Sequence, residues 1–508
     1  MLKGMAKPIT KGLSLMLFYI LANFFNGIAI SGTEINLVDF AEQTSSSVQT
    51  MSSALMWRAA GHLLGSLLSG YIFSWSCFSV HNWVWLGFIL NNLVLLALPQ
   101  TPEVFVLFLL YLATGFICSL GVAGIMMMIK TLCDDENDSG KWFQLLPVSF
   151  QVGVTILPAF QLFASMTVSY TMFGLIGLTV CSANLLILVV GKKHVCSSGR
   201  QQETLTFDNI RMESNLKNSE EVLQSATEQE EDGSLHQVGQ IEPFTDSSCF
   251  YGGTSSAAEE DICVGAEPQV HQIPTTNGVT DYVEEEGIKR RLLAWHDIMI
   301  SMVALCITGV IVQTMAYIGL YSSEIYGVHD VQTVILVVSL TVLAGQLACI
   351  YLQNGTNLFM AYLYFTSCTA ISVASMTGLL VYSLVVTVSY HHQSDNDDDS
   401  SLSPLVSSKT TSKVIFWTLL SAFGASQGPL INFMFDIWNK LSLQPTKYGA
   451  SCVTIGLFSG SGAIPSFVFY LWQRLGSPHV LIIGNSIVLI AALGFALGSL
   501  AKDFVFIS

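Results

Sequence analysis

The sequence predicts an all-α membrane protein with twelve transmembrane helices, arranged as two bundles of six. Hydrophobic residues make up 51% of the chain and charged residues only 11%, against roughly 25% charged residues in a typical soluble domain. The mean hydropathy is positive, +0.56. Apolar runs of about 20 residues recur along the chain, and as helices they can cross about 30 Å of hydrocarbon. The short alternating strands of outer-membrane barrels are absent from the sequence, which favours helices.

The predicted spans divide into two equal sets around a long polar segment. The chain is therefore expected to contain an N-terminal six-helix bundle (1–190), a linker (191–294) and a C-terminal six-helix bundle (295–508). The spans are expected at residues 12–31, 50–73, 82–99, 103–129, 142–164, 168–190, 297–322, 331–352, 357–389, 413–437, 449–472 and 478–500.

The linker is rich in Glu, Ser, Gln and Gly and contains too few apolar residues to form a core. Residues 201–288 hold about half of the acidic residues of the chain but only Arg211 and Lys217 among its basic residues. The formal net charge of −16 therefore arises in this segment, and the membrane part is close to neutral. We expect the linker to be disordered and cytoplasmic, and a second polar segment at 391–413 to be a solvated loop on the opposite side.

Lys and Arg residues in the loops predict the orientation of the bundle. Most of them fall on the side of the N-terminus, among them Lys3 and Lys7, whereas only Lys409, Lys413 and Arg474 fall on the other side. Because cytoplasmic loops are enriched in Lys and Arg, this asymmetry places both termini in the cytoplasm. The plasma membrane is the expected location.

The two halves share a pattern of Gly and Pro residues. The segments GVTILP (153–158) and GSGAIP (460–465) occupy the fifth span of each half. Paired spans interrupted by Gly and Pro at corresponding positions are typical of internally duplicated transporters. A shift of the fourth and fifth spans by 307 residues matches Gly121 with Gly428, Gly153 with Gly460, Pro158 with Pro465 and Phe160 with Phe467.

Neutral polar side chains recur inside the predicted spans. A polar helical face in a bilayer must face the bundle interior or a water-filled cavity. One interpretation is that these side chains form hydrogen bonds between helices. The other is that the amide donors and acceptors together bind an uncharged polyhydroxyl solute. The candidate substrate-binding residues are Asn23, Asn26, Gln144, Gln151, Gln313, Tyr317, Gln427 and Asn432.

The second predicted span contains Arg58 and, one turn deeper on the same face, His62. A charge at this depth must face protein or water. In a structural role, Arg58 would clamp helix-end carbonyls or a carboxylate such as Glu34 or Asp39. In a functional role, it would be part of a gate, and we assign Arg58, His62, Glu34 and Asp39 as candidate gating residues.

Three segments carry a family resemblance. WRAAGHLLGSLLSG (57–70), FQLLPVSFQVGVTILPAF (143–160) and FGASQGPL (423–430) resemble the second-, fifth- and tenth-span signatures of the sodium-dependent glucose transporter branch of the major facilitator superfamily. The resemblance implies a central site, alternating access and a sugar as substrate, with sodium as the coupling ion. The chain departs from the branch at Gln346, where the branch carries an arginine.

The sequence thus predicts a secondary transporter that moves a small neutral polar solute, with a sugar as the first choice. We do not expect an enzyme, because the HExxH, Walker A and GxSxG motifs are absent. The eleven cysteines include no CxxC pair, and we expect no metal site and no cofactor apart from sodium. The alternative is a membrane sensor or scaffold that does not transport, with an acidic linker that binds cytoplasmic partners. In either case the lipid bilayer surrounds the helices.

Overall fold

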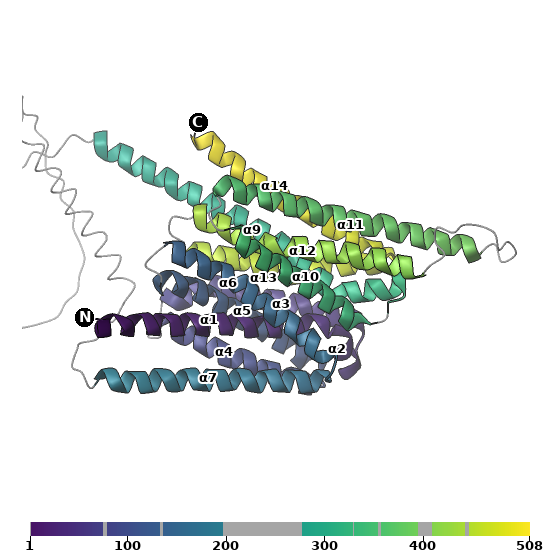
Figure 1. The fold of residues 1–508 in the computed structure, drawn as a ribbon, viewed down its shortest axis with the longest axis horizontal. Coiled ribbons are helices and arrows are strands. Elements are labelled where there is room, and N and C mark those ends of the chain that lie inside the picture. The colour runs from purple at the N-terminus through teal and green to yellow at the C-terminus, as the bar shows by residue number, and fades with distance from the viewer. Residues whose placement is uncertain are drawn as a thin grey trace, which may run out of the picture. The chain divides into compact units, whose positions relative to one another are not determined.

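The computed structural model describes residues 2–74, 79–132, 136–196, 277–328, 330–353, 357–394, 409–441 and 447–507. All regular structure in these ranges is helical (Figure 1). The elements are α1 (Leu2–Ile35), α2 (Leu37–Gln43), α3 (Val48–Ser74), α4 (Val80–Ala97), the 3-10 turn η1 (Leu98–Gln100), α5 (Val104–Leu132), α6 (Glu136–Gln161), α7 (Met166–Cys196), α9 (Asn277–Tyr326), α10 (Val331–Leu352), α11 (Leu358–Ser394), α12 (Lys409–Leu441), α13 (Lys447–Leu475) and α14 (His479–Ile507).

Each predicted span coincides with one long helix, and the prediction of twelve long helices in two halves of six is confirmed for the described residues. The helical backbone extends further than predicted at the start of the second half. α9 begins at Asn277, within the range assigned to the disordered linker. The sequence of this part is EEEGIKRR at residues 284–291, and Glu followed four residues later by Lys or Arg is a spacing typical of helices. α7 likewise continues to Cys196, so residues 191–196 of the predicted linker are helical too. The rest of the linker prediction, at residues 197–276, lies outside the described residues.

Eleven of the described helices are long and apolar enough to cross a membrane, and α3 is not among them. α3 has 27 residues, so its length is sufficient. Its hydropathy is lowered by polar side chains, and Arg58, His62, Ser66 and Ser69 are all fully buried. Because α3 packs against α5 and α13, these polar groups contact protein, whereas side chains such as Leu67 are exposed on the outer face.

Local sequence signals explain where several helices begin and where they are interrupted. The side chain of Ser79 accepts a hydrogen bond from the backbone N–H of Asn82 at the start of α4. Asp330 caps α10 in the same way through Thr333. Prolines lie inside α6, α12 and α13, and each removes one hydrogen bond from its helix. These prolines are Pro147, Pro158, Pro429 and Pro465.

Glycines allow helices to approach closely at corresponding places in the two halves. Gly153 of α6 lies against the backbone oxygen of Phe24 in α1, and Gly460 of α13 lies against the backbone oxygen of Leu305 in α9. A Cβ atom at either glycine would collide with that oxygen. The matched pair of glycines therefore performs the same packing task in both halves, which supports the internal repeat.

The two halves meet mainly along two helix pairs, and α5 with α13 and α6 with α12 add smaller contacts. α3 packs against α13, and α6 packs against α10. Residues Met1–Ile187 and Asp281–Ser508 form one unit, which contains the helices of both halves. Side chains that lie between the halves come from α1, α3, α5 and α6 on one side and from α9, α10, α12 and α13 on the other.

Candidate functional site

A cavity of about 90 Å³ lies between the two halves. Its walls are supplied by helices of the first half and of the second half, and most of the lining side chains are apolar. Phe150, Phe435 and Phe458 are the aromatic members of the lining. The polar lining residues are Asn23, Glu34, Gln151, Thr308, Gln346 and Ser461. A small molecule held in this cavity would contact both halves at once.

Two of the predicted substrate-binding residues line the cavity. Asn23 in α1 donates from Nδ2 to the backbone oxygen of Leu146 at 2.8 Å. Gln151 in α6 donates from Nε2 to the backbone oxygen of Ser339 in α10 at 3.3 Å, and so connects the two halves. Both amides keep their side-chain oxygens available as acceptors.

The other predicted substrate-binding residues do not line the cavity. Four of them contact groups of their own half: Asn26 accepts from Asn91, Gln313 donates to the backbone of Leu481, Tyr317 stacks on Phe469 and Asn432 donates to the backbone of Gln346. The Oε1 of Gln313 and the Oδ1 of Asn432 have no hydrogen-bond partner among the described residues. Gln427 is fully buried, and Gln144 is half-buried at the start of the fifth span. For these six residues the cavity geometry does not support direct contact with a solute.

The sequence interpretation missed two polar groups at the cavity. Gln346 in α10 is 1% exposed, and neither its Oε1 nor the hydroxyl of Thr308 in α9 has a hydrogen-bond partner among the described residues. Helical periodicity shows that a residue faces inward, but it does not distinguish the interior of one half from the surface between halves. The signal at Gln346 was its departure from the branch pattern. Thr308 gave no signal, because threonines are common in membrane helices.

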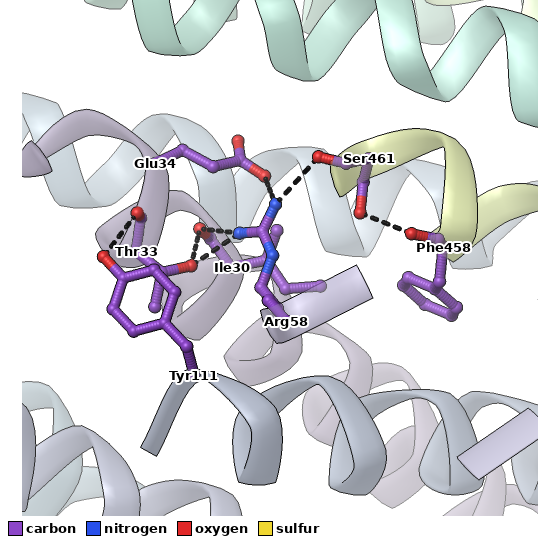
Figure 2. A network of polar contacts seen from close by, with 7 residues as sticks. All are labelled: Ile30, Thr33, Glu34, Arg58, Tyr111, Phe458 and Ser461. Atoms are coloured by element: carbon purple, nitrogen blue, oxygen red, sulfur yellow. Dashed lines mark hydrogen bonds and ion pairs between the residues drawn. The ribbon is translucent and has the colours of Figure 1, made fainter. Parts of the chain in front are cut away.

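Arg58 is the centre of a hydrogen-bonded network beside this cavity (Figure 2). Its Nη1 donates to the hydroxyl of Thr33 at 2.6 Å and to the backbone oxygen of Ile30 at 3.2 Å. Its Nη2 donates to Oε1 of Glu34 at 2.8 Å and to the backbone oxygen of Ser461 at 3.3 Å. We call these five residues the Arg58 network. Three of its bonds run to α1 in the same half, and the fourth reaches α13 in the other half.

Burial makes the ion pair in this network costly to break. Arg58 is 0% exposed and Glu34 is 3% exposed. Removing one partner of a buried ion pair leaves an unpaired charge and typically costs about 3 to 5 kcal/mol. The sequence allowed a clamp on carbonyls or on a carboxylate, and the structure shows both at once. Tyr111 of α5 supports the same region by donating to the backbone oxygen of Thr33 at 2.8 Å.

The remaining candidate gating residues lie in different surroundings. His62 is fully buried and stacks on Phe458 of α13, with ring centroids 4.4 Å apart. It therefore lies on the surface between the halves. Asp39 is exposed in the first turn of α2 and is not part of the Arg58 network. Partial burial of its carboxyl and the neighbouring Glu42 raise the pKa of Asp39.

Contacts between α3 and α13 occur on both sides of the cavity. Towards the start of α3, the hydroxyl of Ser466 donates to the backbone oxygen of Ser52 at 3.4 Å. Towards its end, the hydroxyls of Ser69 and Ser451 are 3.0 Å apart. The cavity is therefore bounded on both sides along this helix pair. We refer to the first side as the α2 side, because α2 precedes α3, and to the second as the termini side, where the N-terminus of α1 lies (Figure 1).

Comparisons with known proteins agree with this architecture. Residues 19–390 match the family described as Major Facilitator Superfamily. No curated protein matches the chain. One similar solved structure is the "crystal structure of a bacterial homologue of iron transporter ferroportin in outward-facing state", with a TM-score of 0.55 and 10% identity, over 96% of this chain and 99% of that one. At this identity the likeness shows the fold alone.

The family match covers most of the chain, including Ile30, Thr33, Glu34 and Arg58 of the Arg58 network and the helices that line the cavity from the first half. It indicates a transporter that resides in the bilayer, not an enzyme. With twelve long helices in its described ranges, arranged as two repeated halves around a shared cavity, this multi-pass membrane protein belongs to the major facilitator superfamily of secondary transporters.

Proposed function

We propose that the protein carries a small neutral polar solute, with a sugar as the first choice, by alternating access of the central cavity to the two sides of the membrane. The observation that carries this proposal is the pair of unpartnered groups at the cavity, Gln346 Oε1 and the Thr308 hydroxyl. Buried polar groups are normally hydrogen-bonded. Hydroxyl groups of a solute would supply the missing partners.

The rest of the lining supports the same class of solute. The side-chain oxygens of Asn23 and Gln151 add acceptors, and Phe150, Phe435 and Phe458 provide apolar surface for the C–H faces of a sugar ring. Sites of this kind combine an apolar wall with a few placed polar groups. The resemblance of three segments to the sodium-dependent glucose transporter branch supports a sugar in particular.

We further propose sodium as the coupling ion. The resemblance to the sodium-dependent branch supports this choice, and Glu34 is the acidic side chain among the described residues that line the cavity. Oxygen ligands are suited to hard cations. The Lys and Arg asymmetry of the loops supports an orientation with both termini in the cytoplasm, and we propose the plasma membrane as the location.

The test is solute uptake by the purified protein in liposomes. A panel of radiolabelled sugars would be assayed with and without a sodium gradient, and separately with a proton gradient. We expect saturable uptake of at least one sugar that increases with inward sodium. Uptake of Fe²⁺ in the same vesicles would test the substrate named for the similar structure. Uptake of no sugar, in vesicles shown to contain folded protein, would refute the proposed substrate class.

Site variants make this test specific. Gln346→Leu and Thr308→Val each remove a group that we assign to solute binding, and each should weaken apparent affinity by about five- to 150-fold. Gln313→Leu is the matched control, because Gln313 is equally buried but bonds to Leu481 within its own half. The control should lower stability without changing apparent affinity. If all three variants kept the apparent affinity of the wild-type protein, Gln346 and Thr308 would not belong to the site.

A further inference from the structure

The two halves contain matched prolines whose freed carbonyls are used differently. In a helix the N–H of residue i bonds to the carbonyl of residue i−4, and proline has no N–H to donate. Pro158 therefore frees the carbonyl of Val154 in α6, and Pro465 frees the carbonyl of Ser461 in α13. The two carbonyls are related by the same shift of 307 residues that relates the two prolines, and both residues line the cavity.

In the first half, the freed carbonyl is satisfied locally. The hydroxyl of Ser31 in α1 donates to the backbone oxygen of Val154 at 3.1 Å. Both residues belong to the first half, so this bond does not depend on how the two halves are placed.

In the second half, the freed carbonyl is satisfied from the opposite half. Arg58 Nη2 donates to the backbone oxygen of Ser461 at 3.3 Å. The hydroxyl of Ser461 is already used, because it donates to the backbone oxygen of Phe458 at 2.7 Å (Figure 2). When the halves separate on the α2 side, the Ser461 carbonyl loses its donor and must be hydrated.

Arg58 itself is held in place by its own half. Its bonds to Ile30, Thr33 and Glu34 all run to α1, so the guanidinium keeps its position whether or not Ser461 is near. Gly462 permits the approach, because it lies against the backbone oxygen of Leu55 and against Ala59. The donor is therefore fixed in one half, and the acceptor is created by a proline in the other.

We propose that Pro465 is a positioning residue of the transport cycle: by freeing the Ser461 carbonyl, it creates the acceptor that Arg58 binds when the halves close on the α2 side. The proline thereby stabilises the closed form on that side relative to the open form. This inference rests on the proposed alternating-access function, but it concerns the conformational equilibrium and requires no particular solute.

The experiment restores the missing donor. Pro465→Ala returns an N–H that can bond to the Ser461 carbonyl within α13. The carbonyl then has a donor in its own helix and no longer depends on Arg58. Pro158→Ala is the matched control at the equivalent position of the first half. The readout is the rate at which an impermeant maleimide labels Thr308→Cys, a cavity-lining position, from the α2 side, in a background without reactive native cysteines.

We expect Pro465→Ala to increase this labelling rate by about tenfold, since a hydrogen bond to a charged donor is worth about one to two factors of ten in an equilibrium. Pro158→Ala should leave the rate within about twofold of the parent. In an Arg58→Met background, Pro465→Ala should have no further effect, because the donor is already missing. Pro465→Gly, which also restores the N–H, covers the case in which the alanine variant fails to fold.

Two outcomes would overturn the proposal. One is a folded Pro465→Ala or Pro465→Gly protein that labels at the parental rate. The other is an equal increase in Pro158→Ala, which would indicate general helix loosening. Labelling is measured without solute, so its result does not depend on the proposed substrate class. A cavity that never became accessible from both sides of the membrane would contradict alternating access itself.

Discussion

Arg58 illustrates how a single charge can be tolerated in the interior of a membrane protein. Its four hydrogen bonds combine one carboxylate, one hydroxyl and two backbone oxygens. A planar guanidinium can serve several acceptors at once, and a lysine ammonium cannot reproduce that geometry. The residue therefore neutralises Glu34 and connects the halves with the same group.

The coupling between Arg58 and Glu34 can be measured by a double-mutant cycle. Arg58→Met and Glu34→Gln should each lower the free energy of unfolding by about 3 to 5 kcal/mol, because each leaves a buried charge without its partner. The double variant should cost clearly less than the sum of the two single variants. Chemical unfolding in detergent micelles provides the measurement. Additive losses would show that the two charges do not interact in the folded protein.

Transport rates separate the two roles of Arg58. Arg58→Lys should retain attraction to Glu34 but lose the simultaneous bonds to Thr33 and Ser461, so we expect a folded protein with slow transport, reduced by about tenfold or more. His62→Gln should be milder, because an amide can replace a neutral imidazole as donor and acceptor. Initial rates in liposomes at saturating solute would be compared. Wild-type rates in Arg58→Lys would show that only its charge matters.

At the scale of single residues, the sequence predicted which side chains need a polar partner better than it predicted which of them line the cavity. It offered Glu34 as a partner for Arg58, because a charge in an apolar segment demands a partner, and the two form a buried ion pair. Their role in gating stays a prediction. It also selected Gln313 and Tyr317, which do not line the cavity: Gln313 donates to Leu481 and Tyr317 stacks on Phe469. A single sequence indicates on which face of its helix a side chain lies. It does not indicate which other helix packs against that face.

At the scale of single helices, glycines decide how closely the halves can approach. Gly462 of α13 lies against the backbone oxygen of Leu55 and against Ala59 in α3. A larger residue there must push the two helices apart, which acts on the surface between the halves rather than on either half alone. The same helix contains Gly460, which packs on α9 within its own half, so neighbouring glycines serve different contacts.

Gly462→Val should therefore favour the form that is open on the α2 side. Overpacking of this kind costs about 1 to 3 kcal/mol, or about five- to 150-fold in the ratio of closed to open forms. Labelling of Thr308→Cys from that side should rise accordingly. Gly498→Val is the control, because nothing lies within 4 Å of a Cβ built at Gly498. Similar labelling of both variants would contradict the assignment of Gly462 to the closing surface.

Helix boundaries were predictable where local signals exist. Ser79 and Asp330 cap helices close to the expected starts of spans, since their side chains satisfy free backbone N–H groups. The start of α9 at Asn277 was not predicted, because a polar segment with suitably spaced charges resembles a linker by composition and a helix by pattern.

At the scale of the whole molecule, the fold was predictable because membrane solvation leaves few choices. Every backbone polar group in the bilayer must be satisfied internally, so long apolar segments become helices. The matching Gly and Pro pattern indicated two repeated halves. The cavity between them was not predictable in detail, because its lining depends on how seven helices pack.

The linker provides a test at this scale. Removing residues 201–276 should leave folding and transport within about twofold of the intact protein, because its composition cannot support a core of its own. Removing 201–288 also deletes the helical start of α9 and should lower thermal stability further. Fluorescence-detected size exclusion and uptake in liposomes would measure both. Loss of folded protein after the shorter deletion would show that the linker has a structural role.

The polar content of α3 also bears on how the chain enters the bilayer during synthesis. The translocon releases a helix into lipid according to its hydrophobicity, and an arginine near the helix centre adds about 2.5 to 3.5 kcal/mol to the cost of insertion. α3 contains Arg58 and no acidic residue, whereas its partner Glu34 is supplied by α1. We therefore expect α1 to remain beside the translocon until α3 emerges, and the two helices to insert as a pair.

Glycosylation mapping in microsomes can test this order of assembly. α3 alone should insert inefficiently, inclusion of α1 should raise insertion several-fold, and Glu34→Gln should abolish most of that gain, since a protein counter-charge is what makes the arginine tolerable in lipid. If α3 alone inserted as completely as α5, the ion pair would matter only after assembly. If the expectation holds, the ion pair that joins α1 to α3 in the folded protein is also the contact that allows α3 to insert into the membrane.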